Sequence, residues 1–442
     1  MRWPAGRDQK RKGDSERNKV KRTPQYILGK ILTENSLFAK IRQIFLALGG
    51  LMVLLHVFWL LIVSALGFAS PLRAQEPPFP VPDGLEGAVS FWKQIFAQYS
   101  TNEVVLFDPV DPGTIYTVVR AVDNEEGRAL LEKERARVIA EYDLADDESR
   151  IRSQRGAKEH FTEGLKIAGR YISEMKKIFR GEGLPVELVY LPLVESSFNI
   201  LARSGAGAVG MWQFMPDTGK KFLRIDGNID ERRDPFESTK AAARLLKENY
   251  RLLGTWPLAI TAYNHGTDGI FRGIKAVESD NIVDLIRQYQ SPTFGFASKN
   301  FYAEFLAVVE LATNKDVYFP FLRFHSPVTL REVATKRQIP LRLVLKPAAI
   351  SSSDFFQWNP ALDSSASVLP GGYRIKLPPD KVDDFLAAER RVVTPASKAR
   401  GKSVKKSSDR PKRVVAAARR NSQPPKGSIS RGSRAGVKLA AQ

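Results

Sequence analysis

Residues 183–219 read GLPVELVYLPLVESSFNILARSGAGAVGMWQFMPDTG, and the organisation of the chain follows from this stretch. An apolar run at residues 188–194 leads into Glu195. Gly183 ends the segment before it, and Pro185 suits the first turn of a helix. The pattern predicts that Glu195 lies at or near the end of a buried helix. Burial disfavours the charged form of a carboxyl group, so we expect a raised pKa, which suits a general acid.

One glutamate before two serines is most often a surface or capping residue, so Glu195 alone is weak evidence for catalysis. Three further motifs follow it. Ser204 lies in SGAGA, Gln213 lies in GMWQFMP, and Tyr263 and Asn264 lie in AYNHG. Four motifs in this order are far more specific than any one of them.

The order ES…S-x-x-GA-x-G-x-WQ-x-MP…AYN-x-G resembles that of lytic murein transglycosylases of glycoside hydrolase family 23. Residues 230–239, with DERRDP and a Ser-Thr pair, resemble the membrane-bound lytic transglycosylase D subgroup. The resemblance is strong over residues 155–315 and weaker over 85–150 and 325–378. It implies a mainly α protein with a goose-type lysozyme-like all-α catalytic domain. A small α/β N-terminal lead-in and a small LysM-like α+β C-terminal module complete the expected fold.

The resemblance also implies a reaction. Glu195 would protonate the glycosidic oxygen between N-acetylmuramic acid and N-acetylglucosamine, with the 2-acetamido group stabilising the positive charge. As a carboxylate it would then take the proton of the muramyl 6-hydroxyl, which closes a 1,6-anhydro ring without water. The residues expected to bind substrate or shape its cleft are Ser204, Gln213, Tyr263, Asn264 and Tyr302. Of these, Tyr263 is expected to hold Glu195.

Other function classes stay open. Ordinary glycosidases use two carboxylates, whereas the motifs supply one. A second carboxylate from a distant part of the chain, such as Asp230 or Glu304, would make the protein a hydrolytic lysozyme. A non-catalytic peptidoglycan-binding scaffold is a further alternative, which the intact Glu195 disfavours.

Composition limits cofactors and partners. The chain has no Cys, and its four His, at 56, 160, 265 and 325, are not paired as metal ligands usually are, so we expect neither metal nor cofactor. Of the net charge of +20, residues 1–44 carry +8 and residues 390–442 carry +15, which leaves −3 for the rest. A nucleic-acid-binding fold should carry its basic residues on the fold itself, so nucleic acid is an unexpected partner. A membrane-anchored nucleic-acid binder that works through the basic tails stays open as an alternative. The expected partners are peptidoglycan strands and a membrane. Oligomeric state is left open.

The N-terminal region predicts a membrane anchor. Residues 45–68 form an apolar run without a charged residue, long enough for a helix that spans a bilayer. The basic segment 1–44 before it predicts a cytoplasmic N-terminus, with the catalytic domain in the periplasm of a bacterial envelope. Cleavage of the run as a signal peptide, with secretion to the periplasm, is the alternative.

The remaining regions follow in order. Residues 75–150 predict an N-terminal accessory region with a helix, a hairpin and a charged helix. Residues 151–320 predict the transglycosylase domain, beginning with one helix over 157–179. Residues 325–380 predict the LysM-like module, with helices at 329–337 and 351–358 and a closing strand at 371–378. Residues 390–442 are too polar and basic to bury a core and predict a disordered tail.

Overall fold

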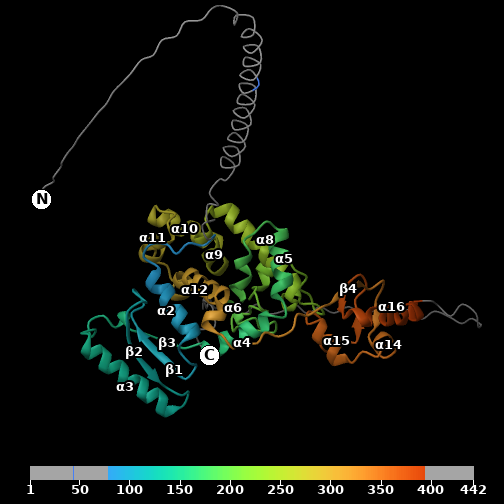
Figure 1. Ribbon diagram of the computed structural model, residues 1–442, viewed down its shortest axis with the longest axis horizontal. Helices are drawn as coiled ribbons and strands as arrows, with labels where there is room; N and C mark the ends of the chain where they lie inside the picture. The colour runs from blue at the N-terminus through green and yellow to red at the C-terminus, as the bar shows by residue number, and fades with distance from the viewer. Residues whose placement is uncertain (1–42, 44–77, 394–442) are drawn as a thin grey trace, which may run out of the picture. The chain divides into compact units, whose positions relative to one another are not determined.

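The computed structural model describes residue 43 and residues 78–393 (Figure 1). The chain divides into two units at Pro77/Pro78, and the description below concerns the unit that begins at Pro78. The predicted anchor and most of both basic ends therefore lie outside the described residues. Within the described residues, no helix combines the length and the apolarity that a membrane span requires.

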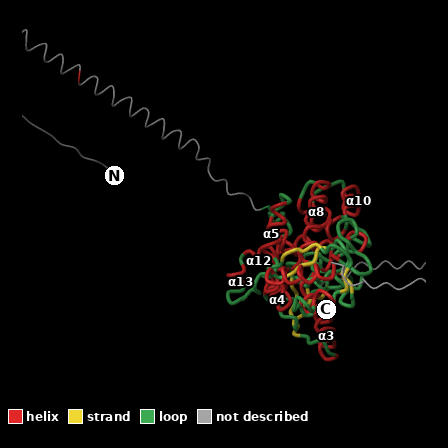
Figure 2. Tube along the Cα trace, turned by 90° about the vertical axis from the view of Figure 1, so that its right-hand side faces the viewer, coloured by secondary structure: helices red, strands yellow, loops and turns green. Residues whose placement is uncertain are grey.

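Helices dominate the middle of the chain, as the sequence predicted (Figure 2). They are α4 (Lys158–Ala168), α5 (Ile172–Gly181), α6 (Leu191–Ser196), α7 (Pro216–Gly219), α8 (Pro235–Leu253), α9 (Trp256–His265), α10 (Thr267–Val277), α11 (Ile282–Gln288), α12 (Phe296–Thr313) and α13 (Lys315–Tyr318), with 3-10 turns η2 (Val186–Tyr190) and η3 (Glu231–Arg233). The stretch after Gly266 was not predicted to be helical, yet it forms α10.

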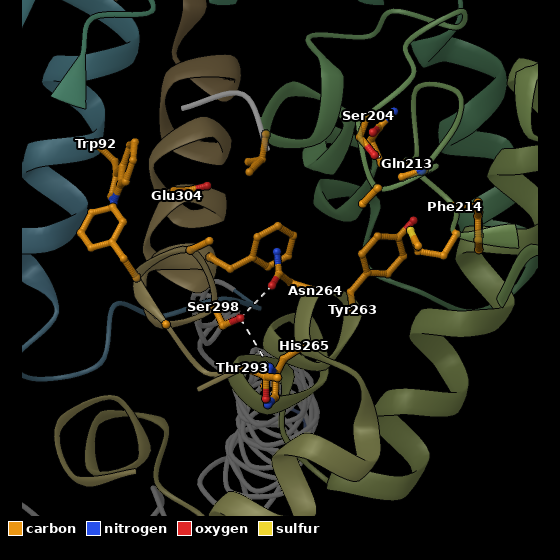
Figure 3. Close-up of a pocket in the computed structure, with 18 of the residues that line it drawn as sticks. Trp92, Ser204, Gln213, Phe214, Tyr263, Asn264, His265, Thr293, Ser298 and Glu304 are labelled. Carbon is orange, nitrogen blue, oxygen red and sulfur yellow. Dashed lines mark hydrogen bonds between the residues drawn. The ribbon is translucent and has the colours of Figure 1, made fainter. Parts of the chain in front are cut away.

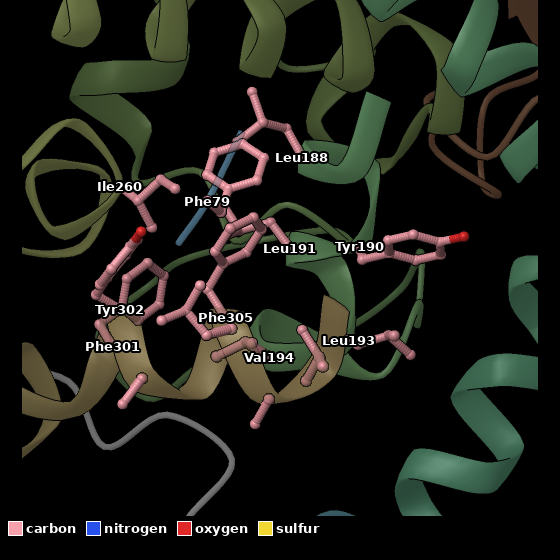
Figure 4. Close-up of a cluster of buried hydrophobic side chains, with 14 of the residues drawn as sticks. Phe79, Leu188, Tyr190, Leu191, Leu193, Val194, Ile260, Phe301, Tyr302 and Phe305 are labelled. Carbon is pink, nitrogen blue, oxygen red and sulfur yellow. The ribbon is translucent and has the colours of Figure 1, made fainter. Parts of the chain in front are cut away.

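The core of this region gathers around α12, whose buried face carries Phe301, Phe305 and Val308. Helix α9 is almost wholly apolar and is buried at Leu258, Ala259 and neighbouring residues. Figure 4 shows side chains of η2, α6, α9 and α12 meeting in one apolar cluster. Removing a buried Leu side chain from such a core costs about 2–5 kcal/mol.

The prediction of one helix over residues 157–179 was wrong, because the chain breaks at Gly169 between α4 and α5. Residues 324–328 cross the chain there, and the amide of His325 donates to the carbonyl of Lys166. A Cβ atom at Gly169 would lie 2.6 Å from the carbonyl oxygen of His325. The buried stripe continues across the break, so apolar spacing alone did not reveal it.

The N-terminal accessory region contains α2 (Glu86–Ala97), a three-stranded antiparallel sheet and α3 (Glu125–Glu141). The strands are β1 (Glu103–Phe107), β2 (Ile115–Arg120) and β3 (Arg152–Arg155), in the order β2-β1-β3, with a 3-10 turn η1 (Glu148–Arg150) before β3. The helix and the hairpin were predicted, whereas the polar strand β3 was not.

One part of this accessory region packs into the main core, and another part has a small core of its own. Helix α2 packs on α12, and its Phe91, Trp92 and Ile95 belong to the main apolar core. The indole nitrogen of Trp92 donates to the Oδ1 atom of Asn300 at 2.9 Å. The outer face of the sheet and α3 form a separate small core around Val138.

We call residues 331–393 the C-terminal module. It contains β4 (Arg331–Ala334), β5 (Ile339–Pro340), α14 (Arg342–Leu345), α15 (Ser352–Trp358), β6 (Val368–Leu369), β7 (Arg374–Leu377) and α16 (Pro379–Val393). Strand β4 pairs antiparallel with β7, and β5 pairs with β6. The second helix and the closing strand were predicted. The helix predicted at 329–337 was wrong, because Val333 is buried between exposed neighbours and pairs with Ile375 across the sheet.

Candidate active site

Glu195 lies on α6, a helix of only six residues that are all buried. Pro192 stands in its first turn, and the helix ends at Ser197, whose φ of 50° is left-handed. A helix this short is not stable by itself, so packing against its neighbours holds it in place. Glu195 is 2% exposed, as predicted for a carboxyl group at the end of a buried helix.

A cavity of about 610 Å³ opens beside this helix, and Val194 is part of its wall. Figure 3 shows Trp92 and Glu304 on one side of it and Ser204 and Gln213 on the other. Four of the five residues predicted to meet substrate line this cavity: Ser204, Gln213, Tyr263 and Asn264.

Tyr263 lies on α9 and reaches across to the loop that carries Gln213. Its hydroxyl donates to the carbonyl oxygen of Trp212 at 2.8 Å. Burial raises the pKa of Tyr263 well above its ordinary value, and the charge of Glu195 raises it further. Tyr263 is therefore a neutral hydrogen-bond donor at physiological pH, close enough to Glu195 to feel its charge.

Ser204 and Gln213 lie at the two ends of one cavity-lining loop. The Oγ atom of Ser204 accepts from the amide of Ala208 at 3.0 Å, which closes the first turn. The backbone of Gln213 has a φ of 48°, which is rare for any residue other than glycine. The Nε2 atom of Gln213 donates to the carbonyl oxygen of Gly210 at 2.8 Å. Strained backbone of this kind persists only where the surroundings hold it, and it is common at functional sites.

Arg232, which the sequence reasoning missed as a site residue, holds this loop from behind. Its guanidinium donates to the carbonyl oxygens of Gly207 at 3.1 Å and Phe214 at 3.2 Å. Two further bonds of 2.8 Å join it to both carboxylate oxygens of Asp230. A Cβ atom at Gly210 would lie 1.8 Å from the carbonyl oxygen of Arg232, so only glycine fits there. The signal in the sequence was an arginine beside acids in DERRDP.

The same segment anchors the C-terminal module. The amide of Asp230 donates to the carbonyl of Ala361 at 2.7 Å. Lys376 of β7 forms an ion pair of 2.5 Å with Asp234, and both side chains are at most 5% exposed. Asp234 also caps the first turn of α8. The C-terminal module therefore reaches the cavity loop through a continuous set of hydrogen bonds.

Asn264 lies on the cavity wall with its amide oriented by a neighbour. The hydroxyl of Ser298 donates to its Oδ1 atom at 2.9 Å, and the Nδ1 atom of His265 lies 3.5 Å from the same hydroxyl (Figure 3). This bond leaves the Nδ2 donors of Asn264 for other partners. Ser298 was not predicted from the sequence, because it lies 34 residues from Asn264 in a segment without a motif.

Tyr302 does not line the cavity, in contrast to the prediction. It is fully buried in the apolar cluster of Figure 4, where its hydroxyl lies 3.5 Å from the carbonyl oxygen of Pro80. Burial raises its pKa. Glu304, two residues further along α12, does line the cavity. The rotation of the helix between these two positions turns one side chain into the core and the other toward the cavity.

The two carboxylates considered as second catalytic groups are placed differently. Asp230 is bound by Arg232 and is not among the residues that line the cavity. Glu304 is on the cavity wall (Figure 3). Within residues 78–393, no group of three or more His, Asp or Glu side chains is arranged to hold a metal ion.

Comparison with known proteins finds one family model that matches part of the chain. Residues 172–285 match the family model Transglycosylase SLT domain. This stretch contains Glu195, Ser204, Gln213, Tyr263 and Asn264.

Particular relatives match parts of the chain. The chain is 30% identical over 209 residues to Membrane-bound lytic murein transglycosylase D of Escherichia coli K12, covering 46% of this chain and 45% of that protein. It is 36% identical over 110 residues to a Putative tributyltin chloride resistance protein of Alteromonas, covering 24% and 51%. The chain thus spans about half the length of these curated relatives. Among solved structures, lytic transglycosylase Slt of Pseudomonas aeruginosa matches with a TM-score of 0.28 and 18% identity over 43% of this chain and 30% of that one.

Proposed function

We propose that this protein is a peptidoglycan lytic transglycosylase. It cleaves the β-1,4 bond between N-acetylmuramic acid and N-acetylglucosamine without water and leaves 1,6-anhydro-N-acetylmuramic acid ends. The observation that carries the proposal is the placement of a buried glutamate, Glu195, beside a cavity lined by four of the predicted substrate residues. The match of residues 172–285 to the transglycosylase domain supports the same assignment.

In this mechanism Glu195 is the single acid and base. It protonates the glycosidic oxygen as the bond to the muramyl carbon breaks, and the 2-acetamido group of the same sugar stabilises the positive charge. Glu195 then accepts the proton of the muramyl 6-hydroxyl as that oxygen closes the ring. Because the nucleophile is held within the same sugar, its pre-positioning can lower the barrier by about 7–11 kcal/mol.

The residues around Glu195 orient the sugar. Tyr263, neutral and fixed on Trp212, keeps the side of the cavity next to Glu195 rigid. Gln213 and Asn264 both line the cavity, and their amide groups bind the acetamido and hydroxyl groups of the glycan. Ser204 donates its hydroxyl proton to the glycan, while its oxygen accepts from the amide of Ala208.

Mass spectrometry of peptidoglycan digested by the full-length protein in detergent tests the reaction. Transglycosylase products end in anhydro sugars, weigh one water less than lysozyme products and resist borohydride reduction. Reducible muramyl ends as the main product would refute the proposal.

A hydrolytic muramidase is the second candidate, and the position of Glu304 is the observation that favours it. A second carboxylate on the cavity wall is what activation of water requires. A Glu304→Gln variant separates the two. A hydrolase should lose about 10²–10⁴-fold in rate, whereas a transglycosylase that uses Glu195 alone should keep its anhydro products and most of its rate.

We also propose that the protein is held at the inner membrane of a bacterial envelope, with its catalytic part in the periplasm. The uncharged run at residues 45–68 and the basic segment before it support this location. The relative of 30% identity is named membrane-bound. Carbonate extraction and N-terminal sequencing test it, and a mature N-terminus near residue 70 or 75 would indicate secretion instead.

The C-terminal module is proposed to be a LysM-like peptidoglycan-binding module. Its strand-helix-helix-strand order, with β4 paired to β7, supports this reading. A second cavity of about 870 Å³ lies between α14, α15 and the β5–β6 pair, with Arg342 and Lys346 at its wall. Replacing both by Ala should weaken retention on insoluble peptidoglycan, whereas Arg331 and Lys336, outside the cavity, serve as the matched control pair. Equal retention of both double variants would contradict a binding role.

A further inference from the structure

The main cavity is completed by residues that lie outside the stretch matched to the transglycosylase domain. One side comes from the N-terminal accessory region and from α12, which precede and follow residues 172–285. The residues on this side that matter here are Trp92, Phe96, Arg152, Gln154 and Phe296. The accessory region therefore supplies part of the cavity wall and does more than support the fold.

Arg152 differs from the two arginines beside it. Arg150 forms an ion pair with the buried Asp108. Arg155 donates from one nitrogen to the carbonyl oxygens of Thr101 and Ala121, at 2.9 and 3.1 Å. Both therefore hold the sheet together. Arg152, by contrast, is exposed at the cavity, and within residues 78–393 it forms no ion pair.

The position of Arg152 is nevertheless fixed. Its guanidinium carbon lies 4.2 Å from the centre of the Phe296 ring, so the cation is stacked on the aromatic face. The backbone beneath it is held in register, because Arg152 pairs with Phe107 across the sheet. A stacked guanidinium keeps its N–H edges available, and these edges match the two oxygens of a carboxylate. Among the described residues that line the cavity, Arg152 is the one Lys or Arg.

We propose that Arg152 binds a carboxylate of the glycan substrate and so makes the enzyme favour strands that carry acidic groups. This inference rests on the proposed function. Two parts of peptidoglycan can supply the carboxylate. One is a stem peptide, and the other is the lactyl group of N-acetylmuramic acid, which is ionised only where the peptide has been removed. The chemistry is the same in both, and the substrates below distinguish them.

The test compares the full-length protein with its Arg152→Gln and Arg152→Lys variants on three glycan preparations. The first carries intact stem peptides, the second carries the same peptides with their carboxylates methyl-esterified, and the third has been stripped by an amidase so that the lactyl carboxylates are free. Arg120→Gln is the matched control, because Arg120 is exposed on β2 of the same sheet and does not line the cavity.

Arg152→Gln should raise KM about 10- to 100-fold on a carboxylate-bearing preparation and should change kcat less. This is the effect expected from losing a charge-assisted pair of hydrogen bonds. Arg152→Lys should recover part of the loss because it keeps the charge without the planar fork. On esterified strands the variant and the parent should have the same KM. A rise on peptide-bearing strands identifies a stem carboxylate, and a rise on stripped strands identifies the lactyl group.

Two results with an active parent would overturn the inference. In the first, Arg152→Gln raises KM equally on charged and esterified strands; in the second, it leaves KM unchanged on every preparation. Failure of the proposed function looks different, because the parent itself would then release no anhydro products. Binding of the same preparations to a Glu195→Gln protein, with and without Arg152→Gln, gives a second readout that does not depend on turnover. Equal affinities there would also count against the proposal.

Discussion

Replacing Lys376 by Met should destabilise the contact between the C-terminal module and the helical region. Lys376 and Asp234 are 5% and 2% exposed at their side chains, and their charged atoms are 2.5 Å apart. Glu237 lies 3.8 Å from the same ammonium group. Without Lys376 the carboxylate of Asp234 is left buried, which costs about 3–5 kcal/mol. The positive end of α8, which Asp234 caps, offsets about 0.3–2 kcal/mol of this. The expected net loss is therefore about 1–5 kcal/mol.

A double-mutant cycle measures this coupling. The double variant Asp234→Asn/Lys376→Met removes both charges, and Asn is also a good helix cap, so most of the lost stability should return. Guanidinium unfolding gives the global effect, and hydrogen exchange of the β4–β7 amides reports the module itself. A loss below about 0.5 kcal/mol for Lys376→Met, or a double variant as unstable as the sum of the two single ones, would refute the reasoning.

The pH dependence of this pair has a definite sign. Burial alone would lower the pKa of Lys376, but the charge and hydrogen bond of Asp234 raise it above its ordinary value. Because the pKa in the folded state lies above the unfolded value of about 10.4, the stabilisation from Lys376 is complete below that pH. It is lost only as the pH rises through the folded value, so the lysine contributes no pH dependence near neutrality.

Three further predictions concern the site. Glu195→Gln should leave the melting temperature near that of the parent and lower the rate of release of anhydro products by at least about 10²–10⁴-fold, and near-normal turnover would exclude Glu195 as the acid. Arg232→Gln removes the bonds to Gly207 and Phe214, so kcat/KM should fall about 10- to 100-fold while the far-ultraviolet circular dichroism stays the same; unchanged kcat/KM would show that the loop does not need this support. Tyr302→Phe should keep kcat and KM within about twofold, because Tyr302 is buried away from the cavity, and a large rise in KM would return it to the substrate site.

Much of the local structure and part of the candidate site could be predicted from sequence. The apolar run before Glu195 predicted a buried helix end without any knowledge of the segments that pack against it. The ordered motifs around Ser204, Gln213 and Tyr263 indicated one site, because their order resembles that of the lytic murein transglycosylases. The alternation around Ile375 likewise predicted the closing strand.

Tertiary structure decided the rest, because those features depend on which distant segments meet. The helix is interrupted at Gly169, although its apolar stripe continues, because residues 324–328 cross there. The direction of α12 buries Tyr302 and turns Glu304 to the cavity, although both lie within one turn. Arg152 belongs to a polar strand without apolar alternation, and only the pairing of β3 with β1 brings it to the cavity. Local periodicity specifies which face of a segment is apolar, but the partner of that face is set by packing across the whole chain.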